Sequence, residues 1–153
     1  SIFNPIGLKQ LRKIAGPSIG ANLDPSHLFY LGMDPNLVIK ELDRNIIYHV
    51  HAKDSKIDTN KTNLTGVLDL HPMHLVSERS WGYRTLGFGH DEIWWREFVC
   101  CLREVGYDGV LSIEHEDSFM SNTEGIIKGI RFLEPIILKT LPEGKTGYWR
   151  LPK

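Results

Sequence analysis

The sequence has little cysteine and no long hydrophobic run, and these two absences exclude several classes of protein. Its two cysteines, Cys100 and Cys101, are adjacent, so they cannot cross-link distant parts of a fold, and no C-x-x-C spacing indicates a thiolate metal site. We therefore expect a reduced, cytoplasmic protein. No uncharged apolar stretch is long enough to cross a bilayer, so we expect no membrane span. The N-terminus lacks the basic and apolar segments of a signal peptide, and we expect none.

Charge of one sign is also lacking. The 18 Lys and Arg residues are balanced by 19 Asp and Glu residues, for a net charge of -1. Because affinity for nucleic acid comes from concentrated Lys and Arg, this balance argues against nucleic acid as the main partner. The 153 residues are 41% hydrophobic, which suits one globular core. We expect residues 1–153 to form a single domain, with a loosely ordered tail at 142–153.

Hydrophobic periodicity and turn residues predict helices that alternate with strands. We expect strands at about 18–24, 45–51 and 109–114, and helices at about 5–15, 35–42, 92–105 and 122–138. Residues from about 53 to 90 show little periodicity, and we expect a long, irregular loop there, of the kind that is usually functional or disordered. Strands that are separated by helices indicate parallel βα units. Three such strands are visible.

The predicted strands carry polar residues on one face near their carboxyl ends. Side chains alternate between the two faces of a strand. Asp24, His51 and Glu114 are each the last residue on the polar face of a predicted strand. Parallel strands that are covered on both faces are normally apolar throughout, so this polarity needs a functional reason. Carboxylate and imidazole groups are ligands for Mn²⁺, Zn²⁺, Mg²⁺ and Co²⁺. We therefore predict that Asp24, His51 and Glu114 bind one divalent metal ion; the structural alternative is that they are polar residues at strand ends with ordinary hydrogen bonds.

Three further residues are candidates for binding a substrate. His27 lies three residues after Asp24, and Asp54 lies three residues after His51, so each would lie beside a predicted ligand. Arg84 offers a guanidinium fork for an anionic or polyhydroxyl substrate. Structural alternatives are a backbone contact for His27, a loop cap for Asp54 and a surface salt bridge for Arg84.

Four segments occur in an order that resembles a known enzyme family. They are Asp24-Pro25-Ser26-His27, His49-Val50-His51-Ala52-Lys53-Asp54, Trp81-Gly82-Tyr83-Arg84-Thr85-Leu86-Gly87-Phe88-Gly89 and Ser112-Ile113-Glu114-His115-Glu116-Asp117. Together they resemble the C-terminal part of the sugar phosphate isomerase/epimerase family, the xylose isomerase-like TIM barrels, also called AP endonuclease family 2. This family includes endonuclease IV as well, but the pattern is more similar to the bacterial sugar isomerase/epimerase branch.

The resemblance implies an α/β fold, namely the C-terminal portion, about three βα units, of a (β/α)8 TIM barrel. The strands that end in Asp24, His51 and Glu114 match the sixth, seventh and eighth strands. A full barrel needs about 250 residues, so we expect this barrel to be incomplete as given. Three parallel strands leave two open edges, and we expect a second copy or the missing N-terminal half to pair with them.

The resemblance also implies a reaction. Family members bind a divalent ion through Asp, His and two Glu residues; Asp24, His51 and Glu114 match three of these, and the fourth would lie upstream of Ser1. The implied activity is isomerisation or epimerisation of a sugar, or of a related polyol or keto-acid, by proton transfer through an enediolate. Glu114 would be the catalytic acid/base, and Mn²⁺ is the first choice of ion.

Three alternatives to this activity stay open. A lyase such as an inosose-type dehydratase would use the same centre to expel water. An endonuclease IV-like phosphodiesterase would have three metal ions and a basic DNA-binding face, which the balanced charge does not favour. A fragment without the upstream Glu would be inactive.

Overall fold

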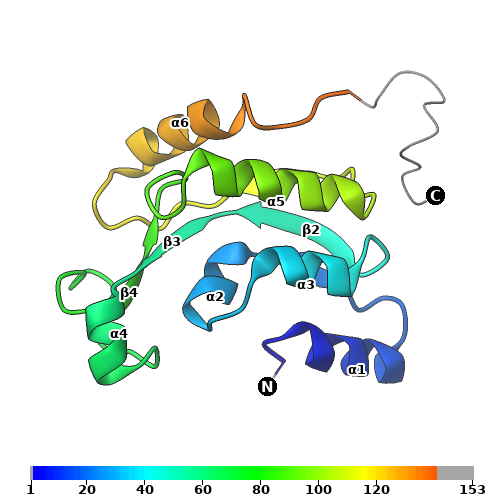
Figure 1. The fold of residues 1–153 in the computed structure, drawn as a ribbon, viewed down its shortest axis with the longest axis horizontal. Helices are drawn as coiled ribbons and strands as arrows, with labels where there is room; N and C mark the ends of the chain where they lie inside the picture. The colour runs from blue at the N-terminus through cyan, green and yellow to red at the C-terminus, as the bar shows by residue number, and fades with distance from the viewer. Residues whose placement is uncertain (1, 141–153) are drawn as a thin grey trace.

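The computed structural model describes residues 2–140, which form a parallel sheet with helices packed along it (Figure 1). Strands β1 (Ala21–Leu23), β2 (Ile47–Ala52) and β5 (Leu111–Ile113) form one sheet in the order β1-β2-β5, and both pairings are parallel. The predicted set of three parallel strands is therefore confirmed. In the sheet of the described residues, β1 and β5 have one neighbour each, so this sheet is open. The predicted loose tail at 142–153 lies outside the described residues.

Four helices follow one another in chain order from the bottom to the top of Figure 1. They are α1 (Pro5–Ala15), α3 (Pro35–Leu42), α5 (Glu92–Glu104) and α6 (Asn122–Leu133). All four were predicted, although α6 ends at Leu133 rather than near 138. A side-chain oxygen caps the start of each, from Asn4, Asp34, Asp91 and Ser121. Within residues 2–140, the helices are too short or too polar to cross a bilayer.

The hydrophobic core lies between the sheet and helices α3 and α5. Trp95 and Phe98 of α5 are fully buried and belong to the same apolar cluster as Val50 and Ala52 of β2. Side chains alternate along β2, so the residues between these two point to the other face of the sheet. The helices thus cover the apolar face of β2, and His51 is left on the opposite, uncovered face.

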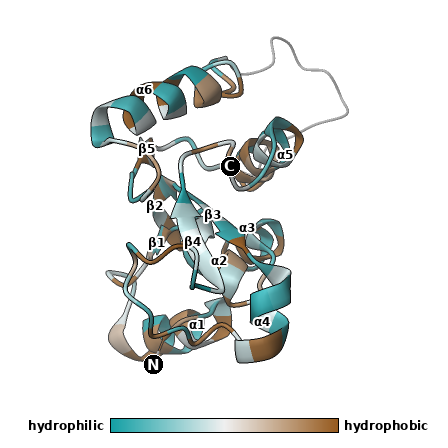
Figure 2. Cartoon of the chain, turned by 90° about the vertical axis from the view of Figure 1, so that its left-hand side faces the viewer, coloured by the Kyte–Doolittle hydropathy of each residue, from teal (hydrophilic) through white to brown (hydrophobic). Residues whose placement is uncertain are grey.

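The segment at 53–90 contains an antiparallel hairpin, so the prediction of an irregular loop is wrong there. Strand β3 (Asp54–Ile57) begins directly after Lys53 and pairs with β4 (Trp81–Arg84); α4 (Thr59–Thr65) lies between them in the chain. The hairpin has no alternating apolar pattern, since the first two residues of β3 are buried and polar. Figure 2 shows much of β4 in pale colours, which correspond to side chains of intermediate hydropathy.

A short helix, α2 (Pro25–Tyr30), begins where β1 ends and was not predicted. Asp24 caps it, because Oδ1 accepts a hydrogen bond from the backbone N–H of Ser26 at 2.9 Å. The signal was present, since α1 and α3 also begin with an Asn-Pro or Asp-Pro pair. The cap fixes the Asp24 carboxylate at the carboxyl end of β1, and it makes β1 shorter than the predicted 18–24.

Candidate metal centre

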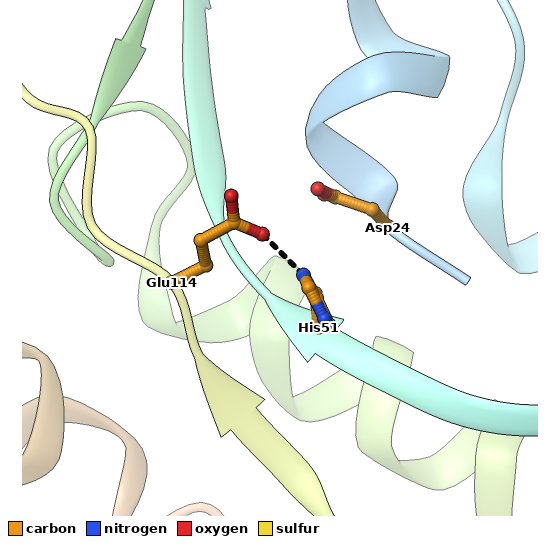
Figure 3. A group of neighbouring side chains, drawn as sticks. All are labelled: Asp24, His51 and Glu114. Atoms are coloured by element: carbon orange, nitrogen blue, oxygen red, sulfur yellow. Dashed lines mark hydrogen bonds and ion pairs between the residues drawn. The ribbon is translucent and has the colours of Figure 1, made fainter. Parts of the chain in front are cut away.

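Asp24, His51 and Glu114 come together at the carboxyl ends of β1, β2 and β5 (Figure 3). One potential ligand atom from each lies within 4.8 Å of the other two. Two carboxylates and one imidazole, converging from three adjacent strands, form a donor set that suits Mn²⁺, Zn²⁺, Mg²⁺ or Co²⁺. The structure thus shows the predicted convergence of these side chains, and the residues present fit a divalent ion.

The imidazole of His51 is held from two sides. Its Nδ1 contacts Oε2 of Glu114, and its Nε2 lies 3.1 Å from the side-chain amide of Asn22. Asn22 shares a face of β1 with Asp24 because the two are separated by one residue. These contacts fix the plane of the ring, with Nδ1 directed toward Glu114, as partners of metal-binding histidines commonly do.

The two oxygens of Asp24 have different partners. Oδ1 caps α2, whereas Oδ2 lies 3.4 Å from Nε2 of His27. Figure 3 shows the carboxylate directed toward His51 and Glu114. Burial raises the pKa of Asp24, and hydrogen bonds from Ser26 together with the charges of His27 and Lys53 offset this only in part. A cation at the centre would compensate the charge of this carboxylate.

Lys53 belongs to the site and was missed in the sequence analysis. Its side chain is only 2% exposed, its Nζ lies 3.0 Å from Oε1 of Glu114, and it also contacts Oε2 of Glu116. The ammonium lies 4.0 Å from the centre of the Tyr83 ring. Strand alternation could have identified it, because Lys53 follows His51 by two residues, as Glu116 follows Glu114.

These contacts change the pKa values of both partners. Burial by itself would lower the pKa of Lys53, but hydrogen bonds with Glu116 and Glu114 and the charge of Asp24 raise it above its ordinary value. Burial likewise acts to raise the pKa of Glu114, but hydrogen bonds from Lys53 and His51 outweigh it and lower the pKa. Glu114 is therefore ionised at neutral pH in the metal-free protein.

The structure brings His27 to the centre but not Arg84. His27 is exposed, contacts Asp24, and packs edge-on against Tyr83 with ring centres 5.7 Å apart. Arg84 donates from Nη1 to the backbone oxygen of Tyr83 at 2.6 Å, and its guanidinium lies 4.5 Å from the centre of the Phe119 ring. Between residues 2 and 140, no hydrogen bond or ion pair joins Arg84 to the three candidate ligands.

Asp54 is fully buried and has no surface for a substrate. Oδ2 accepts hydrogen bonds from the backbone N–H groups of Gly87, Gly89 and His90 at 3.2, 3.0 and 2.9 Å, and Oδ1 lies 2.7 Å from Nδ1 of His90. A Cβ atom on Gly89 would lie 2.3 Å from the Ser55 oxygen, so this close approach requires glycine. The prediction that Asp54 contacts a substrate is therefore wrong, and its carboxylate instead holds the turn at 87–90.

A groove of about 280 Å³ runs along the open edge of β1 and reaches Asn22, Asp24 and His27. It offers a route to the centre at the carboxyl end of the sheet. A separate cavity of about 480 Å³ lies at the opposite end of the strands, beside Arg44 and Tyr107. Active sites of open α/β sheets and barrels lie at the carboxyl ends of the strands, which favours the groove.

We expect Asp24→Asn to lower Mn²⁺ affinity by about 100-fold or more without destabilising the metal-free protein at pH 7. Asn caps helices as well as Asp does, so α2 keeps its cap. The pKa of Asp24 is raised in the folded state, so its ionised form opposes folding at pH values above that pKa. Removing the charge relieves this effect. Calorimetric titration with Mn²⁺ and thermal unfolding without metal measure the two quantities.

Asp34→Asn is the matched control for this variant. Asp34 caps α3 with the same geometry, 2.9 Å from the N–H of Asn36 and directly before Pro35, but it is not among the three converging residues. Its Mn²⁺ affinity should equal that of the unaltered protein. If Asp24→Asn bound Mn²⁺ as tightly as Asp34→Asn does, Asp24 would not be a ligand.

Comparison with known proteins gives the same fold. The sequence profile described as a xylose isomerase-like TIM barrel matches residues 7–136. The uncharacterized protein YfiH of Bacillus subtilis (strain 168) is 38% identical over 136 residues, which are 89% of this chain and 43% of that protein. The crystal structure of a xylose isomerase domain protein from Planctomyces limnophilus has a TM-score of 0.62 at 22% identity, covering 87% of this chain and 43% of that one. Identity this low shows a shared fold alone.

The chain spans less than half the length of both relatives. Its open parallel sheet with alternating helices agrees with part of a barrel. The resemblance inferred from the four sequence segments is confirmed by the profile match over most of the chain. The chain belongs to the xylose isomerase-like TIM barrel family.

Proposed function

We propose that this protein, in its full-length form, is a divalent-metal-dependent isomerase or epimerase of a sugar or of a related polyol or keto-acid. The observation that carries the proposal is the convergence of Asp24, His51 and Glu114 at the carboxyl ends of three parallel strands. Barrels of this kind have their active sites at that end. Sugar isomerases and epimerases belong to the same family.

Asp24, His51 and Glu114 are the residues that we propose as ligands. We propose Mn²⁺ as the ion, although Zn²⁺, Mg²⁺ and Co²⁺ use the same types of ligand. When bound, a divalent ion polarises neighbouring carbonyl and hydroxyl oxygens of a substrate and so acidifies the C–H bond between them. A fourth ligand would come from outside the described residues.

Glu114 is the residue that we assign to proton transfer. Its pKa is held below the ordinary value, so its carboxylate is available to accept a proton from a substrate carbon and leave an enediolate. The proton then returns to the neighbouring carbon in an isomerase. In an epimerase, a second carboxylate delivers a proton from the opposite face.

Two residues are proposed to bind the substrate. The His27 imidazole is exposed beside Asp24 and would donate a hydrogen bond to a substrate hydroxyl. Arg84 offers a planar set of donors for a hydroxyl pair or an anionic group, and it would reach a substrate that extends over β4.

We also propose where the protein acts and what it pairs with. The outer edges of β1 and β5 are unpaired among the described residues, and further barrel strands or a second copy would cover them. Cys100 and Cys101 are both free thiols, which supports the cytoplasm as the compartment.

The test is an assay of the full-length protein on ketoses and on inosose, after chelation and again with added Mn²⁺. We expect Mn²⁺ to restore isomerisation or epimerisation, with exchange of the substrate C–H for deuterium from D₂O followed by NMR. Loss of water from inosose, without isomerisation or epimerisation of any substrate, would instead indicate a lyase. Cleavage of abasic DNA would indicate a phosphodiesterase. No reaction of any substrate with Mn²⁺ present would contradict the proposal.

A further inference from the structure

Lys53 joins the parallel sheet to the hairpin, because it is the single residue between β2 and β3. Its side chain is 2% exposed, which is rare for lysine unless the ammonium is paired. Here the ammonium has two carboxylate partners, Glu114 and Glu116, and one aromatic face, that of Tyr83. These three groups hold Nζ in one position beside the proposed metal centre.

The two oxygens of Glu114 consequently have different surroundings. Oε1 lies 3.0 Å from Nζ of Lys53, whereas Oε2 contacts Nδ1 of His51. An oxygen that accepts a hydrogen bond from a buried ammonium is poorly placed to bind a cation as well, since the ammonium and the cation repel each other. Oε2, which lies beside the imidazole of a second proposed ligand, is therefore the oxygen that we assign to the centre.

We propose that Lys53 is a positioning residue that presents Glu114 to the metal ion through Oε2 alone, and that Glu116 in turn anchors Lys53. The inference rests on the proposed function, because it assumes an ion between Asp24, His51 and Glu114. Glu116 suits the anchoring role because its carboxylate contacts Nζ of Lys53 directly. About half of the Glu116 side chain is exposed to solvent. Without Lys53, the Glu114 carboxylate is free to rotate and to offer both oxygens.

The effect of removing Lys53 on Mn²⁺ affinity distinguishes a purely electrostatic role from a positioning role, because the two roles predict changes of opposite sign. If Lys53 acted only through its charge, Lys53→Met would strengthen Mn²⁺ binding, because one repulsive charge is lost. If it positions Glu114, Lys53→Met weakens Mn²⁺ binding by about 10- to 100-fold, as is usual for partners of metal ligands. We expect the weakening. Calorimetric titration of the full-length protein with Mn²⁺ measures it, and equal or tighter binding would overturn the proposal.

A spectroscopic measurement adds a second criterion. Co²⁺ reports coordination number through its visible absorption, so we expect the absorption of Co²⁺-loaded Lys53→Met to differ from that of the unaltered protein. Lys56→Met is the matched control, because Lys56 is exposed on β3 and has no ion pair among the described residues. Its Mn²⁺ affinity and Co²⁺ spectrum should not change. Identical Co²⁺ spectra for Lys53→Met and Lys56→Met would also overturn the proposal.

A pair of variants at Glu116 tests the anchor and does not depend on the folding of Lys53→Met. Glu116→Gln keeps an acceptor for Nζ and should keep Mn²⁺ affinity within about threefold, whereas Glu116→Ala should lower it about 3- to 10-fold. Equal affinities for the two would refute the anchoring role. Both tests use metal affinity, so an inactive protein that binds Mn²⁺ would reject the proposed reaction and leave this inference standing. Absence of Mn²⁺ binding to the unaltered protein would reject both.

Discussion

Glu114→Gln is expected to lower the kcat of the proposed reaction, measured on the full-length protein, by about 1000-fold or more at saturating Mn²⁺. Gln keeps the shape of the side chain and an oxygen to accept the hydrogen bond from Lys53, but an amide cannot take up a proton at neutral pH. General-base catalysis by one carboxylate contributes about 10² to 10⁴ in rate, and a 1000-fold loss corresponds to about 4 kcal/mol in the activation barrier.

The measurement must separate proton transfer from loss of the ion. Mn²⁺ is therefore titrated against each variant first, and kcat is measured at a concentration that saturates that variant. Glu124→Gln is the control, since Glu124 lies exposed in the first turn of α6 and pairs with Lys128. It should keep the activity of the unaltered enzyme. A Glu114→Gln enzyme within tenfold of this control would mean that another residue moves the proton.

Asp54→Ala should reduce the free energy of unfolding by about 3–5 kcal/mol, because it leaves several buried donors without a partner. The carboxylate accepts hydrogen bonds from three backbone N–H groups in the turn at 87–90, and it contacts the ring of His90. This turn follows β4, so its loss would also loosen the hairpin that carries Tyr83. Urea unfolding of the full-length protein, followed by circular dichroism, measures the change.

Asp91→Ala is a suitable comparison for Asp54→Ala. Asp91 is an exposed helix cap that accepts one hydrogen bond, from the N–H of Trp94 at 2.9 Å, and its loss should cost about 1 kcal/mol. The two variants remove the same chemical group from a buried and from an exposed position. If both lowered the stability equally, the buried network at Asp54 would not be the main support of the turn.

Local sequence patterns were sufficient for the parallel βα units. Asn-Pro and Asp-Pro pairs mark helix starts, and the hydrophobic periodicity of residues 92–105 was sufficient to predict α5. Alternation along β2 was also sufficient to place His51 on the face away from the helices. The same alternation, continued beyond the end of β2, would have placed Lys53 on the face of His51 and Asp54 on the buried face of Ala52.

The order of residues alone specified the three strands, their helices and the polar residues at the strand ends, because these depend on spacing along the chain. Only the folded chain decided which partners those side chains have. Asp24 caps a helix with one oxygen and faces the centre with the other, and Lys53 contacts two carboxylates more than sixty residues away. The β3–β4 hairpin likewise pairs segments joined by a long connection. Such contacts arise from packing between distant segments, and no short-range periodicity encodes them.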